Sequence, residues 1–213
     1  MFMGRLKHGT PVDEENIEKA LKYLPDASPS YPLARLLCNA MCNSKISYEE
    51  ARRLLGDEAD EALLAANYLR LLIPVRSTND SMNWSDAVLL LQPGETYKMP
   101  NIARHLVADA SITGIWDSEG AVRMLFREMG EPDWNLIPAL VRKVCAEAIA
   151  YKINGFKLDR MCHEVGLGSK VGAMILELKG AGIISPKLDD FAEVQNARSP
   201  IYEVNKSLFL SRD

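Results

Sequence analysis

Two stretches of the sequence, ISYEEARRLLG at 46–56 and FKLDRMCHEVG at 156–166, repeat one apolar pattern when they are aligned at a single constant offset. The aligned positions have matching chemistry, as in Ile46 with Phe156, Gly56 with Gly166, and Ile73 with Ile183. Each copy follows an apolar helical segment that ends in a polar turn, and each precedes two expected strands. A repeat of this kind identifies the structural unit. The unit predicted here is a helix, a short helix, a turn, a third helix and a β-hairpin.

Local signals place the elements inside and around the two copies. Asp13 can cap a helix that ends near Leu24, and Ser47 followed by Glu50 is a capping-box signal for a helix through Leu55. Apolar residues recur at helical spacing in further segments, 33–42, 57–72, 100–110, 118–129, 157–165, 169–179, and from 135 or 138 to 152. Strands are expected at 82–92, 95–99, 181–184 and 201–204.

The second copy continues with MILELKGAGIISPKL at 174–188 and SPIYEVNKSLF at 199–209. This run resembles the end of a winged-helix recognition helix followed by two wing strands, and the resemblance to the winged-helix superfamily extends over about 32–100 and 138–210. It implies a mainly α-helical α+β protein with small β-hairpin wings. The implied domains are an N-terminal helix and proline-rich linker at 1–31, a first winged-helix domain at 32–99, a helical connector at 100–137 and a second winged-helix domain at 138–213.

Composition excludes several classes of protein. The chain has 213 residues, a formal charge of −4, 47% apolar residues and four cysteines. An acidic chain is not a uniformly basic nucleic-acid binder, and sparse cysteines do not form a disulfide scaffold. No apolar run has the length of a membrane span, and the first residues lack the apolar core of a signal peptide. We therefore expect a soluble cytoplasmic protein without a membrane partner.

Charge is distributed unevenly along the chain. Residues 1–139 carry 14 basic and 20 acidic side chains, whereas residues 140–213 carry 11 and 9. The basic excess lies in the second copy, where winged-helix proteins contact phosphates and grooves. The DNA-binding residues expected from this placement are Lys157, Ser169, Lys170, Ala173, Lys187 and Arg198. The alternative, that these side chains form an ordinary solvated surface, stays open.

The first copy is a poor candidate for reading DNA through its third helix. That helix begins with Asp57, Glu58, Asp60 and Glu61. These carboxylates repel phosphates, although they also stabilise a helix N-terminus. We therefore assign DNA binding to the second copy.

No catalytic or metal-binding motif accompanies the repeat. Cys38 and Cys42 lie four residues apart on an apolar helix, which favours buried structural thiols. Cys162 and His163 are adjacent and face different directions on a helix, so they do not form a catalytic dyad. The segment GLGSK at 166–170 lacks the spacing and preceding strand of a phosphate-binding loop. We expect no enzyme activity, no cofactor and no metal.

Two functions agree with these observations. The preferred one is a DNA-binding protein, such as a transcription regulator, that binds double-stranded DNA through the second winged-helix domain. The alternative is a winged-helix module that binds a protein partner as a subunit of a larger assembly. The apolar helices at 100–110 and 118–129 either pack inside the chain or form a homodimer face.

Overall fold

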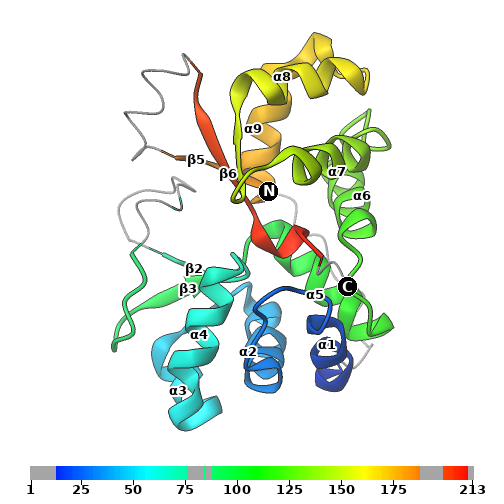
Figure 1. The fold of residues 1–213 in the computed structure, drawn as a ribbon. Helices are drawn as coiled ribbons and strands as arrows, with labels where there is room; N and C mark the ends of the chain where they lie inside the picture. The colour runs from blue at the N-terminus through cyan, green and yellow to red at the C-terminus, as the bar shows by residue number, and fades with distance from the viewer. Residues whose placement is uncertain (1–12, 76–83, 85–87, 188–198, 211–213) are drawn as a thin grey trace.

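The computed structural model of the protein describes residues 13–75, 84, 88–187 and 199–210. Figure 1 shows two small sheets on one side of the molecule, with helices grouped around each of them. The fold is mainly helical with two three-stranded antiparallel sheets. This confirms the expected α+β class.

The first unit, residues 30–98, contains the following elements: α2 (Ser30–Asn43), β1 (Lys45–Ser47), α3 (Tyr48–Leu55), the 3-10 helix η1 (Gly56–Glu58), α4 (Ala59–Tyr68), β2 (Ile73–Pro74) and β3 (Thr96–Lys98). The expected capping box is present at α3. The Ser47 hydroxyl accepts a hydrogen bond from the Glu50 backbone N–H at 3.2 Å, and the Glu50 carboxylate accepts one from the Ser47 N–H at 2.8 Å. Gly56, with a φ of +61°, ends this helix.

The second unit, residues 137–204, has the same order: α7 (Ile137–Glu147), β4 (Lys152–Asn154), α8 (Gly155–Glu164), the 3-10 helix η3 (Gly168–Lys170), α9 (Val171–Ala181), β5 (Ile184–Lys187) and β6 (Ile201–Val204). Its sheet has the order β4-β6-β5, which matches the order β1-β3-β2 of the first unit. The internal repeat expected from the sequence is therefore present in the backbone.

Strand register defines the correspondence between the two units. One row of three paired residues crosses each sheet, Ile46–Tyr97–Pro74 in the first and Ile153–Tyr202–Pro186 in the second. The turn after the third helix also repeats, because Leu71 N–H donates to the Ala66 carbonyl and Ile183 N–H donates to the Leu178 carbonyl. The offset between the units is therefore smaller at the first strands than at these turns, and it is not constant along the chain.

Two pairs of the constant-offset alignment are wrong as a result. The counterpart of Ile46 is the buried Ile153, whereas Phe156 is 62% exposed on α8. The counterpart of Ile183 is Leu71, not Ile73. The cause is two insertions in the second unit: α8 has 10 residues where α3 has 8, and residues 165–167 separate α8 from η3, whereas η1 directly follows α3. The periodicity of apolar residues alone does not reveal insertions of a few residues.

The remaining helices join the two units into one body. They are α1 (Glu14–Leu21), α5 (Asn101–Thr113), α6 (Ser118–Glu128) and the 3-10 helix η4 (Lys206–Leu208). Asp13 caps α1 as expected, by accepting a hydrogen bond from the Glu15 N–H at 2.9 Å. Helix α1 packs against α2 and α5, and α6 packs against α5 and α7. One continuous apolar core extends through both units.

The apolar residues of α5 and α6 lie inside the chain. Leu106, Val107, Leu125 and Phe126 are all buried, with at most 4% of their surface exposed. These four side chains complete the intrachain core and do not form an exposed dimer face.

The strand expected at 181–184 begins only at Ile184, because α9 continues to Ala181, and the helix expected over 57–72 ends at Tyr68. Two other expected elements differ more strongly. Helix α7 ends at Glu147 instead of 152, because Ile149 and Lys152 pair across a turn and β4 then joins β6. Residues 88–91, expected inside a strand over 82–92, form no strand; Val88 is 56% exposed. This segment is instead attached by the Tyr97 hydroxyl, which donates to the Leu90 carbonyl at 2.5 Å. In both places tertiary pairing overrides the local pattern.

The segment 203–208 attaches the second unit to the first. The Glu203 carboxylate binds the Arg70 guanidinium, and the Asn205 amide donates to the carbonyls of Arg70 and Gly182. The Ser207 N–H donates to the Leu69 carbonyl at 3.1 Å. The relative position of the two units is thus set by hydrogen bonds between buried or half-buried groups.

Among the described residues, no helix combines the length and the apolar character that crossing a membrane requires.

Candidate nucleic-acid interface

Three of the expected DNA-binding residues lie together at the start of α9. Ser169 and Lys170 belong to η3, and Ala173 lies in the first turn of α9. Ser169 and Ala173 are exposed. The helical segment expected from residue 169 begins as α9 at Val171; its N-cap is Lys170, and no side chain makes a capping hydrogen bond there.

Helix α9 has an apolar inner face and an open outer face. Met174 and Leu178 are buried, and Val171 and Ile175, which recur with them at helical spacing, are half-buried against the core. The outer face carries Gly172, Ala173, Leu176 and Gly180, all exposed. An added Cβ at either glycine would meet nothing within 4 Å. Another surface can therefore approach the α9 backbone closely along this face.

Lys157 and Lys187 form a second group, at the other end of α8. Lys187 pairs with Ile201, which pairs with Asn154, so all three lie in one row of the sheet. Asn154 caps α8 by accepting a hydrogen bond from the Lys157 N–H at 2.8 Å. Lys157, in the first turn of α8, lies about 10 Å along the axis from the end of that helix at Glu164, and Ser169 follows this end in the sequence. Arg198 lies outside the described residues.

Lys170 is held inside the chain by two carboxylates. Its ammonium contacts the Glu131 carboxylate and lies 2.7 Å from Asp133 Oδ2. Burial acts to lower the pKa of Lys170, but the hydrogen bonds to Asp133 and Glu131 outweigh it and raise that pKa. The sequence expectation of a free, phosphate-facing ammonium therefore competes with a formed ion pair at this position.

Glu177, a residue of α9, adds a third carboxyl group to this cluster. Its Oε2 atom is buried and has no hydrogen-bond partner among the described residues. Burial, followed by the neighbouring charge of Glu131, raises the pKa of Glu177. The Lys170 cluster, defined as Lys170, Glu131, Asp133 and Glu177, thus holds one ammonium and three carboxyl groups. The cluster attaches the start of α9 to the segment 131–133, and its acidic groups outnumber its basic one.

Other basic residues of the second unit are also paired. Arg160 Nη2 lies 2.6 Å from Glu147 Oε2, and its Nε lies 3.4 Å from Glu164 Oε1. Lys143 Nζ lies 2.7 Å from Glu164 Oε2. These exposed pairs contribute little to stability but reduce the positive potential of the surface.

The first unit differs from the second in the chemistry of its third helix. Asp57 is fully exposed on η1 and pairs with Arg52 at 3.2 Å, and Asp60 accepts a hydrogen bond from the Tyr48 hydroxyl at 3.0 Å. The outer face of α4 also carries the exposed Glu61 and Leu64. The acidic side chains at this N-terminal part of the third helix repel a phosphate backbone.

The cysteines occupy different environments. Cys162 is buried, Cys38 and Cys145 are half-buried, and Cys42 is exposed, so the expectation that Cys38 and Cys42 are both buried is wrong for Cys42. Burial raises the pKa of Cys162 to about 11. A thiol of this kind is protonated at neutral pH and is a poor nucleophile. No group of metal-ligating side chains occurs in the described part of the chain.

Sequence comparison places the chain in a family. A family model matches residues 15–212, which covers both units and the helices between them, and the chain belongs to that family. The match brings no activity, ligand or partner with it. No curated protein and no solved structure gives a significant match.

Sequence reasoning missed the Lys170 cluster. Lys170 and Glu131 are 39 residues apart, and the segment at 130–133 reads only as a break between helices. No periodic pattern or motif connects the two positions. The one weak signal was a lysine at the start of an otherwise apolar helix. Such a lysine sometimes pairs with a buried carboxylate, but the sequence does not say which one.

Proposed function

We propose that the protein is a cytoplasmic DNA-binding protein of the winged-helix type, which acts by binding alone through its second unit. The observation that carries the proposal is the open outer face of α9, the third helix of that unit. In helix-turn-helix proteins the N-terminal part of this helix enters the major groove. Gly172 and Ala173 are exposed there and leave space for close approach.

The residues have distinct roles in this proposal. Ala173 and Ser169 face the groove, with the Ser169 hydroxyl available to a phosphate or a base edge. Lys157 and Lys187, at the other end of α8, contact the flanking backbone. Lys170 positions α9 through the Lys170 cluster instead of contacting DNA.

A second candidate is a protein-binding module, and one observation favours it. Leu176 is 67% exposed in the middle of the outer face of α9. A large apolar side chain at the centre of a small-residue face suits a protein surface better than a phosphate backbone. The paired charges around α8 and α9 also reduce the electrostatic attraction that DNA binding needs.

Fluorescence anisotropy with a random-sequence duplex separates the two candidates. Titrations between about 50 and 200 mM salt give the slope of log K against log salt. We expect Lys157→Glu with Lys187→Glu to weaken binding and to reduce that slope by about 0.9 for each lost phosphate contact. The matched control is Arg52→Glu with Arg53→Glu in the first unit, which should change the affinity much less.

Two outcomes contradict the proposal. Equal losses from the two pairs would remove the assignment to the second unit. If the unmodified protein does not bind duplex DNA even at the lowest salt, the protein-binding module becomes the better candidate, and Leu176→Ser then tests the α9 face against Leu64→Ser on α4.

A further inference from the structure

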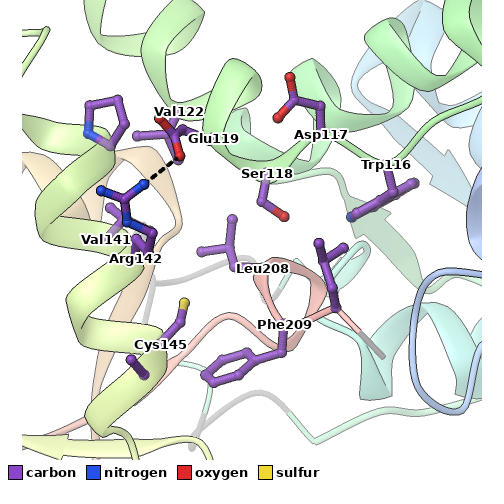
Figure 2. A pocket seen from close by; sticks show the side chains of 13 residues that line it. Trp116, Asp117, Ser118, Glu119, Val122, Val141, Arg142, Cys145, Leu208 and Phe209 are labelled. Carbon is purple, nitrogen blue, oxygen red and sulfur yellow. Dashed lines mark hydrogen bonds and ion pairs between the residues drawn. The ribbon is translucent and has the colours of Figure 1, made fainter. Parts of the chain in front are cut away.

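A cavity of about 520 Å³ opens between α6, α7 and the chain segment 208–210 (Figure 2). Its volume lies within the range of about 300–1,000 Å³ that is typical of small-molecule sites. The cavity is formed by residues distant in sequence, and none of the residues of the candidate DNA interface lines it.

The walls are mainly apolar and fixed in position. Val122 comes from α6, Val141 from α7, and Leu208 from η4. The Trp116 indole N–H donates to the Ser207 carbonyl at 2.8 Å, which holds that ring at one end of the cavity. The Phe209 ring packs edge-on against Tyr151, with ring centroids 4.9 Å apart. A preformed wall lowers the entropic cost of binding an apolar molecule.

One polar atom in this cavity has no partner. The Ser118 hydroxyl is buried, and among the described residues nothing hydrogen-bonds to it. Figure 2 shows that this hydroxyl group points into the cavity. A buried hydroxyl without a partner has an unfavourable free energy, which a ligand with one hydrogen-bonding group would remove.

The charged groups at the rim are paired within the chain. Glu119 Oε2 lies 3.1 Å from Arg142 Nη1, and Glu119 Oε1 lies 3.1 Å from Arg123 Nη2. Asp117 at the same rim caps α6 by accepting a hydrogen bond from the Gly120 N–H at 2.9 Å. The thiol of Cys145, which points into the cavity from α7, is uncharged. A neutral ligand therefore needs no charged partner here, whereas an anion finds no unpaired cation among the described lining residues.

We propose that this cavity binds a small, uncharged, mainly apolar molecule that hydrogen-bonds the Ser118 hydroxyl through one polar group. The site does not depend on the proposed DNA binding. It uses the apolar walls for affinity, Ser118 for orientation, and the absence of an unpaired charge among the described lining residues for selection against a charged ligand.

The probe N-phenyl-1-naphthylamine tests this site because it is neutral, aromatic and carries one N–H donor, and it fluoresces in apolar surroundings. Its sulfonated analogue, 8-anilinonaphthalene-1-sulfonate, has the same scaffold with a negative charge. We expect saturable binding of the neutral probe and weaker binding of the anion. Equal or tighter binding of the anion would overturn the charge selection and with it the proposal.

Variants locate the bound probe. Cys145→Phe fills the cavity and should weaken binding about tenfold or more, whereas Cys42→Phe on the exposed surface of α2 should not. Ser118→Ala should weaken binding about threefold to tenfold, the usual effect of one lost hydrogen bond, and the exposed Ser169→Ala serves as its control. Unchanged affinity in both Cys145→Phe and Ser118→Ala would overturn the proposal.

Cysteine protection gives an answer even where Cys145→Phe does not fold. The unmodified protein is treated with the uncharged thiol reagent methyl methanethiolsulfonate, and the modified peptides are quantified by mass spectrometry. Saturating neutral probe should slow the modification of Cys145 several-fold and leave that of the exposed Cys42 unchanged. An unchanged rate at Cys145 would place the probe elsewhere and overturn the proposal.

Discussion

Arg70 and Glu203 form a bidentate ion pair between the two units of the protein. Arg70 Nη2 lies 2.8 Å from Glu203 Oε1, and Arg70 Nε donates to the same carboxylate at 2.9 Å. The two side chains are only 16% and 13% exposed. Arg70 also has a φ of +60°, the left-handed conformation that its counterpart Gly182 adopts in the second unit. The arginine therefore occupies a strained backbone position, and its side chain makes the contact between the units.

Removal of either partner of this pair should destabilise the protein. We expect Arg70→Ala to lower the free energy of unfolding by about 3 kcal/mol, because the remaining carboxylate loses its bidentate partner at a position that little solvent reaches. Urea unfolding of Arg70→Ala, Glu203→Ala and the double variant should give a coupling energy above about 1 kcal/mol. The exposed pair Arg52–Asp57 is the control, and a coupling as small as its own would contradict the prediction.

Two glycines at the end of α9 should respond to alanine in opposite directions. Gly182 has a φ of +77°, and a Cβ there would lie 2.6 Å from Pro100 Cβ. Gly182→Ala should therefore cost about 1–3 kcal/mol. Gly180 lies inside the helix with open space around it, so Gly180→Ala should add about 0.5–1 kcal/mol. Thermal and urea unfolding measure both changes, and an unchanged or increased stability of Gly182→Ala would show that the turn at 182 is not constrained.

Glu177 should make stability depend on pH. Its pKa is raised above 4.5 by burial and by Glu131, so the folded protein holds this proton more tightly than the unfolded chain does. The stabilising contribution is present below pH 4.5 and is lost as the pH rises through the raised pKa. Glu177→Gln should therefore stabilise the protein at neutral pH, by no more than about 1 kcal/mol because water screens the group.

The control for this prediction is Glu164, whose pKa shifts the other way. The hydrogen bond from Lys143 lowers the pKa of Glu164. Its contribution is lost as the pH falls, and Glu164→Gln should destabilise the protein at neutral pH. Urea unfolding across the acidic range measures both slopes. A steeper loss of stability with rising pH in Glu177→Gln than in the unmodified protein would contradict the role assigned to Glu177.

The two buried indoles of Trp116 and Trp84 should tolerate phenylalanine differently. Both are 2% exposed, but Trp116 Nε1 donates to the Ser207 carbonyl, whereas Trp84 Nε1 has no partner among the described residues. Trp116→Phe leaves a buried carbonyl without a donor. We expect it to destabilise the protein by about 1–2 kcal/mol more than Trp84→Phe, as measured by urea unfolding. Equal losses would mean that the hydrogen bond to Ser207 contributes nothing beyond packing.

Local chemistry was the part of the fold that the sequence predicted best. The capping box of Ser47 and Glu50, the cap at Asp13, and the buried stripe of Met174 and Leu178 all depend on residues within two turns of one another. Such signals act before any tertiary contact forms. The helix expected to reach residue 152 failed because Lys152 pairs with Glu203, a partner far along the chain that no local pattern reveals.

The candidate site was predicted in its position more than in its chemistry. The start of α9 and the exposed Ala173 follow from periodicity, because inner and outer faces alternate with the helical repeat. The state of Lys170 does not follow, since it depends on Glu131 and Asp133 in a separate segment. The cavity beside Ser118 could not be predicted either, because α6, α7 and residues 208–210 meet only in the folded chain.

The attachment of the first unit through residues 203–208 has a consequence for synthesis. These residues leave the ribosome after the whole of the first unit, which has its own helices and sheet and can form them earlier. Until the carboxylate of Glu203 and the amide of Asn205 emerge, the left-handed turn at Arg70 lacks the partners that hold it in the finished molecule. The nascent chain therefore carries a formed first unit whose orientation is set last, when the final strand pairs with β4 and β5.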